Sequence, residues 1–162
     1  MDATDKRIIS LLKTDSRRSA ADIATLLGMD EEQAASRIKR LESSGVIVKY
    51  TAITDDAACD NDVVQAMIEV KVTPQKSKGF DAIAAEICAY SEVKSLYLMS
   101  GGYDLAVLIE GKSLKEVSLF VSEKLSAIES VIATATHFIL KKYKVEGVIT
   151  GESRNGRLPV QP

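Results

Sequence analysis

Residues 30–45 read DEEQAASRIKRLESSG and carry the marks of a short helix with one buried side. Asp30 can cap its start, Gln33 stands in the reciprocal capping position, and Gly45 is a favoured residue just past a helix end. The apolar residues recur at steps of three and four and predict one buried stripe, formed by Ala34, Ile38 and Leu41. The stretch therefore predicts one amphipathic helix.

Two more helices are predicted upstream of this one. Apolar pairs recur at helical spacing between Thr4 and Thr14, and Ser19 with Asp22 forms a capping-box pattern whose apolar stripe ends at Gly28. Three helices with such short connections indicate a helix-turn-helix. One face of the third helix suits the major groove of DNA, because its polar side chains project together: Gln33, Ser36, Arg37, Arg40 and Ser44.

Composition and charge limit the class of protein. The 162 residues are 46% hydrophobic and 27% charged, which excludes a disordered or fibrous chain. The net charge is -2, and the segment up to Tyr50 holds nine basic and eight acidic residues, so any contact with nucleic acid must be local and lie there. No apolar run approaches about 18 residues, and we expect a cytoplasmic protein. Cys59 and Cys88 are too far apart for a paired motif and are expected to be reduced.

The remainder predicts an α+β domain after a strand over Val46–Ile53. Alternating or β-branched segments predict strands at 63–72, 93–99, 103–110 and 131–142, and helical spacing predicts helices at 79–90 and from Ser113 to 128. The second helix should bury Leu114, Val117, Phe120, Val121, Leu125 and Ile128. The order βαββαβ favours a ferredoxin-like antiparallel sheet with both helices on one face.

These elements predict four segments. A winged-helix-like helix-turn-helix domain takes residues 1–53, a linker takes 54–62, the ferredoxin-like domain takes 63–146, and a flexible tail takes 147–162. The Ser100-Gly101-Gly102 turn joins the two central strands into a hairpin, and its glycines can adopt positive φ.

Several motifs resemble the Lrp/AsnC family of feast/famine transcription regulators over residues 2–145. They are RRSAADIA from Arg17, RIKRLESSGVIVKYTA from Arg37, GGYDL from Gly101 and IESVIATATHFIL from Ile128. The resemblance implies that residues 30–44 enter DNA, that residues 63–146 form an amino-acid-response domain, and that chains pack sheet to sheet as homodimers that assemble into octamers or related rings. The chain departs from the family at Asp30, Glu31 and Glu32, where small hydroxylated residues and proline are usual, and at Glu129-Ser130, which replaces Pro-Gly.

The candidate DNA contacts lie in the first third. Arg17 and Arg18 are expected to hold phosphates and the third helix to read bases, so the set is Arg17, Arg18, Gln33, Ser36, Arg37, Lys39 and Arg40. The alternative is a solvated charged face without a partner. Three carboxylates at the start of the helix oppose phosphate, and we expect a modest, salt-sensitive affinity for double-stranded DNA.

The candidate effector site lies at the hairpin and the last strand. A free amino acid needs a carboxylate for its ammonium, which Asp104 offers, and amide or hydroxyl donors for its carboxylate. The full set is Ser100, Gly101, Gly102, Tyr103, Asp104, Thr134 and Thr136, and the family resemblance places it between neighbouring dimers. The alternative is that the glycines only turn, Asp104 caps the turn and the threonines are ordinary sheet residues.

No cofactor or metal site is expected, because His137 has no neighbouring cysteine or acidic pair and should face opposite to Thr136. Met67, Tyr97 and Met99 are interpreted as core or interface residues. The favoured function is a DNA-binding regulator that responds to a small metabolite. The alternatives are an architectural or protein-binding member with weak DNA specificity and an enzyme similar to siroheme decarboxylases. The enzyme is disfavoured because His137 is the sole histidine and the sheet half has no arginine before Arg154.

Overall fold

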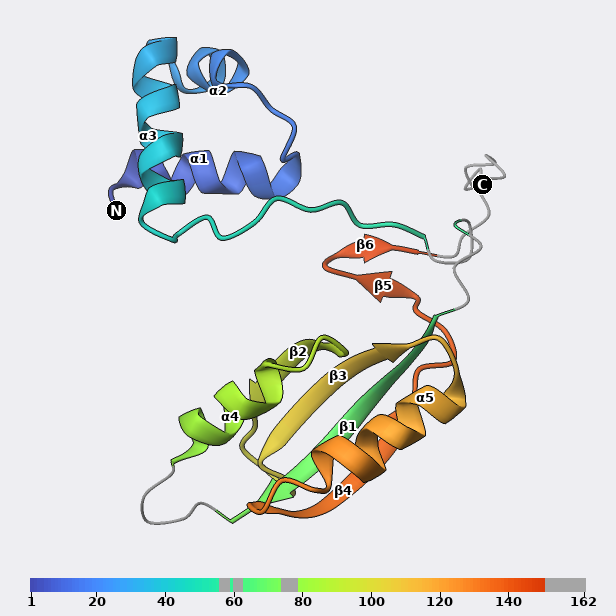
Figure 1. The fold of residues 1–162 in the computed structure, drawn as a ribbon. Coiled ribbons are helices and arrows are strands. Elements are labelled where there is room, and N and C mark those ends of the chain that lie inside the picture. The colour runs from blue at the N-terminus through green and yellow to red at the C-terminus, as the bar shows by residue number, and fades with distance from the viewer. Residues whose placement is uncertain (56–58, 60–62, 74–78, 151–162) are drawn as a thin grey trace. The chain divides into compact units, whose positions relative to one another are not determined.

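Capping residues set the bounds of three helices, α1 (Ala3–Thr14), α2 (Ala20–Leu27) and α3 (Glu31–Ser43). The computed structural model describes residues 1–55, 59, 63–73 and 79–150, and Figure 1 shows the helices and strands. The predicted capping box of Ser19 and Asp22 is present, and Gly28 ends α2 at φ 66°. Asp30 is the N-cap residue of α3, as predicted, but its side chain makes no capping hydrogen bond.

The three helices share one core in the unit Met1–Ile53. The predicted stripe of α3 is confirmed, since Ala34 and Leu41 are buried and Ile38 packs against them half-buried. The remaining buried members come from α1 and α2: Ile8, Leu12, Ile23 and Ala24. Burial of these apolar side chains holds short helices that would be marginal alone.

The strand expected over Val46–Ile53 was wrong, because no described residue of this segment pairs with another strand. The backbone N–H groups of Val46 and Ile47 both donate to the carbonyl of Leu41, at 3.0 Å, so the chain turns back onto the end of α3 after Gly45. The Tyr50 hydroxyl donates to Glu42 at 2.9 Å. Alternating side chains need a sheet to pack against, and here Val48 is 88% exposed.

A four-stranded antiparallel sheet forms the second unit, Thr54–Pro162, in the order β2-β3-β1-β4. Its elements in chain order are β1 (Val64–Val72), α4 (Phe80–Cys88), β2 (Val93–Leu98), β3 (Leu105–Gly111), α5 (Leu114–Leu119), the π-helix η2 (Phe120–Leu125) and β4 (Val131–Phe138). The predicted ferredoxin-like fold is confirmed, and Figure 1 shows α4 and α5 on the same side of the sheet.

The alternation of β1 creates the core of this unit. The predicted inward set is buried, with Ala66, Ile68, Val70 and Val72 each at most 5% exposed. The helices supply Ile83, Ile87, Val117, Phe120, Leu125 and Ile128 to the same core. The opposite side chains of β1, such as Met67 and Glu69, lie on the face without helices.

Other details of the second unit differ from the expectation. Leu114, the first residue of α5, is 58% exposed. The helix is α-helical only to Leu119 and then winds as a π-helix, and the Ser126 N–H donates to the Val121 carbonyl five residues back. The last strand ends at Phe138 instead of residue 142. Neither Gly101 nor Gly102 adopts positive φ.

A short antiparallel hairpin, β5 (Lys144–Val145) with β6 (Val148–Ile149), was not predicted. Its turn residues Glu146 and Gly147 both have positive φ, at 47° and 85°. The predicted boundary between residues 146 and 147 falls inside this hairpin. Residues 56–58 and 60–62 of the predicted linker, and 151–162 of the predicted tail, lie outside the described residues.

Within the described residues, no helix combines the length and apolar character needed to cross a bilayer, and no three His, Cys, Asp or Glu side chains converge as metal ligands. Cys59 and Cys88 are free thiols, and both are exposed.

Candidate DNA-binding surface and effector site

The outward face of α3 is the first candidate surface. Successive helical residues are turned by about 100°, so the positions opposite the buried Ala34 and Leu41 form a stripe along the helix. That stripe is exposed, and it consists of Glu32, Ser36, Lys39, Arg40 and Ser43. It offers hydroxyl groups with a cation on each side, a combination that suits phosphates and base edges.

Two arginines of α3 are held by carboxylates from the start of α1. Arg37 Nη1 donates to Asp2 Oδ2 at 2.7 Å and to Asp5 Oδ1 at 2.8 Å. Arg40 Nη2 donates to both oxygens of Asp5 at 2.8 Å. We call these four residues the Asp–Arg cluster. Its formal charges cancel, and it ties α1 to α3.

Asp5 is the buried member of the cluster, with its side chain 2% exposed. The backbone N–H of Asp2, with help from Arg37 and Arg40, lowers the pKa of Asp5 although burial alone would raise it. Arg37 chiefly lowers the pKa of Asp2, and the two carboxylates raise the pKa of Arg37. Asp2, Asp5 and Arg37 are therefore charged at neutral pH.

The Asp–Arg cluster alters which of the predicted DNA-contacting side chains of α3 are exposed. Arg37 turns toward α1 with a side chain only 30% exposed, whereas the side chain of Arg40 is 59% exposed. Gln33, Ser36 and Lys39 are exposed. Asp2 and Asp5 were not predicted as partners of these arginines, although Asp5 lies on the buried stripe of α1, three residues before Ile8.

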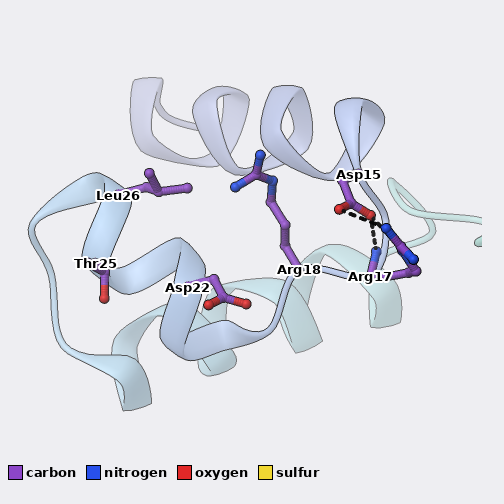
Figure 2. A pocket seen from close by; sticks show the side chains of 6 residues that line it. All are labelled: Asp15, Arg17, Arg18, Asp22, Thr25 and Leu26. Atoms are coloured by element: carbon purple, nitrogen blue, oxygen red, sulfur yellow. Dashed lines mark hydrogen bonds and ion pairs between the residues drawn. The ribbon is translucent and has the colours of Figure 1, made fainter. Parts of the chain in front are cut away.

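Arg17 and Arg18 line a shallow pocket between the end of α1 and α2, together with Asp15, Asp22, Thr25 and Leu26 (Figure 2). Arg17 Nε donates to Asp15 Oδ1 at 3.2 Å, and this bond lowers the pKa of Asp15 and raises that of Arg17. The side chain of Arg17 is nevertheless 89% exposed. Arg18 is half-buried, and its Nε has no hydrogen-bond partner among the described residues. Arg17 is thus the more accessible of the two cations.

Asp104 is hydrogen-bonded to the end of β1. Its Oδ2 accepts the backbone N–H of Val72 at 2.9 Å, its own N–H donates to the Val70 carbonyl at 3.0 Å, and its carbonyl accepts the Met99 N–H at 2.8 Å. These bonds give Asp104 the turn-stabilising role that the sequence left as an alternative. The neighbouring Gly101 and Gly102 are exposed, and a Cβ atom on either would meet nothing within 4 Å.

Thr134 and Thr136 pair with Val70 and Ile68 of β1 and therefore point to the face that carries the helices. Leu105, next to Asp104, pairs with the same Val70 from the other side. Strands β3 and β4 flank β1, so Thr134 lies about 10 Å from Leu105, which is two strand spacings. The exposed Ser100 and the half-buried Tyr103 complete the hairpin end of this predicted set.

The sheet face without helices carries polar and apolar groups together. His137 pairs with Met67 and faces opposite to Thr136, as predicted, and its Nε2 lies 3.4 Å from Glu69 Oε1. Gln65 donates to Glu110 at 2.9 Å on this face. Tyr97 is 54% exposed, Met99 is 40% exposed and Met67 is half-buried.

Comparison with known proteins identifies both units. The AsnC-type helix-turn-helix domain matches residues 1–42, and the Lrp/AsnC ligand binding domain matches residues 65–149. The uncharacterized HTH-type transcriptional regulator YugG of Bacillus subtilis is 44% identical over 100% of both chains. The HTH-type transcriptional regulator FL11 of Pyrococcus furiosus is 33% identical over 89% of this chain and 92% of its own.

A solved structure has the same fold. It is the transcriptional regulator NMB0573 of Neisseria meningitidis in complex with L-Met, which is 24% identical, covers 96% of this chain and 97% of its own, and superposes with a TM-score of 0.71. The sequence match over both units, the relatives named as regulators and the common fold agree with one another. The chain belongs to the Lrp/AsnC family and is a transcriptional regulator with a ligand-binding domain, not an enzyme.

Proposed function

We propose that this regulator binds particular sequences of double-stranded DNA through α3, and that a small metabolite, an amino acid, changes its DNA affinity or its assembly. The observation that carries the proposal is the outward stripe of α3, where Ser36 lies between the exposed cations Lys39 and Arg40 in a helix-turn-helix. Two such helices in a homodimer would meet successive turns of a duplex.

The DNA contacts divide by exposure. Lys39, Arg40 and Arg17 are the exposed cations and take the phosphates, and Gln33 and Ser36 take base edges. Arg18 supports the phosphate contact of its neighbour, being half-buried in the pocket beside Leu26. Arg37 is not proposed to contact DNA directly and has a supporting role, because its Nη1 donates to Asp2 and Asp5.

A second candidate function is an architectural member with weak DNA specificity. It is favoured by the exposed carboxylates of Glu31 and Glu32 and the exposed Asp30 at the start of α3. These charges oppose phosphate and give the leading turn of α3 a net negative charge. They argue for a modest affinity but leave the stripe of Ser36 and Lys39 open to bases, so sequence-specific binding is the first candidate.

The proposed effector site uses the hairpin end. The exposed amides of Gly101 and Gly102 suit a carboxylate, and the Asp104 carboxylate suits an ammonium while it holds Val72. Glycine is required at neither position by φ or by packing within the described chain, which agrees with a ligand approaching the backbone there. Thr134, which lies across β1 about 10 Å from Leu105, and Thr136 complete the proposed set. The Neisseria meningitidis structure contains L-Met.

The coupling between the two sites is proposed to run through assembly. The sheet face without helices is the proposed surface for pairing two chains, and dimers would then assemble into an octamer. An effector that binds one assembly more tightly shifts the population toward it and so changes the spacing of the paired α3 helices.

The test is a selection of random duplexes with the full chain. We expect an enriched palindrome whose half-sites lie about one helical turn apart. Lys39→Ala should weaken binding to that duplex and lower the slope of log affinity against log salt by about 0.9, whereas Lys115→Ala, an exposed lysine of α5, should change neither. No enrichment would support the architectural candidate. A thermal-shift screen with the common amino acids, followed by native mass spectrometry, tests the effector.

A further inference from the structure

The Asp–Arg cluster joins the first turn of α1 to the outward stripe of α3 through Asp5. We propose that Asp5 is a positioning residue for DNA binding: it anchors one corner of the Arg40 guanidinium so that the rest of that group is presented to a phosphate of the duplex. The inference rests on the proposed DNA binding through α3. It assigns a DNA-binding role to a buried carboxylate that does not itself meet DNA.

The burial of Asp5 explains why it can act as a fixed anchor. Its side chain is 2% exposed and accepts the Asp2 N–H at 3.1 Å, besides the bonds from Arg37 and Arg40. A buried carboxylate must keep such partners, because an uncompensated charge in the interior is strongly unfavourable. The capping box fixes the carboxylate on the backbone side, so the position of its two oxygens is set before any DNA arrives.

The two arginines of the cluster have different roles. Arg37 is 30% exposed and gives its Nη1 to Asp2 and Asp5 together, so it mainly balances their charge. Arg40 is 59% exposed, and its hydrogen bonds in the described part of the chain leave from Nη2 alone. A guanidinium carries five N–H groups in a planar fork, and the Nε and Nη1 side of Arg40 is therefore left for an outside acceptor.

Anchoring matters because a free arginine on a helix surface has many rotamers. Its ordering on a phosphate opposes binding, and a side chain already held in the bound orientation loses less freedom. Asp5 also places a negative charge near the duplex, which acts in the opposite direction. The net effect of removing Asp5 on affinity is therefore a poor test, and the coupling between Asp5 and Arg40 is the informative quantity.

The experiment is a double-mutant cycle on the affinity of the full chain for its selected duplex. Arg40→Ala should weaken binding about tenfold in the unmodified chain, the usual loss for one charge-assisted contact. In the Asp5→Asn background the same change should cost less than about threefold, because Arg40 is no longer held. Asp2→Asn is the matched control: it makes the same charge change in the cluster, but of the two arginines Asp2 contacts only Arg37, so Arg40→Ala should still cost about tenfold.

Two further measurements separate positioning from loss of structure. Lys39→Ala must keep its cost in the Asp5→Asn background, since a partly unfolded α3 would lose that contact as well. Arg40→Lys, made in the otherwise unmodified chain, keeps the charge but not the fork that spans Asp5 and a phosphate, and it should bind nearly as weakly as Arg40→Ala. This variant tests the proposal even where Asp5→Asn fails to fold.

The outcomes are distinct. An equal cost of Arg40→Ala with and without Asp5, an equal coupling to Asp2, or full recovery by Arg40→Lys overturns the positioning role while DNA binding stands. An unmodified chain that enriches no duplex overturns the proposed DNA binding and this inference with it.

Discussion

Removal of the Asp104 carboxylate should destabilise the second unit through one backbone bond. In Asp104→Ala the N–H of Val72 loses its acceptor, and Val72 is only 5% exposed. A hydrogen bond to a charged group contributes about 1.5–3 kcal/mol, and the half-buried position of Asp104 argues for about 2 kcal/mol. In a unit of this size that corresponds to a fall in Tm of about 10 °C.

The assay combines thermal unfolding with hydrogen exchange at single backbone amides. Differential scanning calorimetry should show the fall for Asp104→Ala, a much smaller change for Asp104→Asn, which keeps an acceptor oxygen, and none for Glu86→Ala, an exposed carboxylate of α4. Hydrogen exchange should be faster at the Val72 amide in Asp104→Ala. With an amino acid that stabilises the unmodified chain, Asp104→Asn should lose most of that stabilisation, because an amide does not balance an ammonium.

Two results would refute this reasoning. An unchanged melt with unchanged exchange at Val72 would mean that the bond contributes nothing. Full effector stabilisation of Asp104→Asn would mean that Asp104 only fastens the strand and takes no part in the effector site.

Three further changes test packing, capping and charge. Ile68→Ala should lower the free energy of unfolding of the second unit by about 2–5 kcal/mol in urea titration, because the side chain is fully buried; a loss below about 1 kcal/mol would contradict the core assignment. Ser113→Ala should lower the free energy of unfolding by about 1 kcal/mol, since the Ser113 hydroxyl accepts the Glu116 N–H and caps α5. An unchanged Tm would show that this cap does not stabilise the protein. The folded pKa of Asp2 and Asp5 is lowered, so their stabilisation is complete above the unfolded value of 3.8 and is lost as pH falls through the folded pKa. Circular dichroism of Asp2→Asn should show a shallower acid transition, and an identical one would contradict this charge assignment.

Local patterns were sufficient for most of the fold. The capping box at Ser19, the stop at Gly28 and the alternation of β1 each depend on neighbours within a few residues, so they could be predicted from the sequence. The ferredoxin-like sheet with both helices on one face then followed from the βαββαβ pattern.

Features that depend on distant partners could not be predicted from the local sequence. Arg37 has a position on α3 that suits DNA, but Asp2 and Asp5, more than 30 residues earlier, decide where it points.

The segment after Gly45 has the alternation of a strand, yet its first N–H groups donate to the Leu41 carbonyl instead of to a neighbouring strand. Phe120, Val121 and Leu125 follow one another at ordinary helical spacing, so the sequence did not predict the π-helix over Phe120–Leu125.

The central claim is that α3 of this regulator reads the sequence of a duplex. It is tested most directly by the ratio of two affinities, for the selected duplex and for a scrambled duplex of the same composition, measured with the full chain at about 150 mM salt. Specific recognition predicts a ratio of about 10³ or more. Equal affinities for the two duplexes would contradict it.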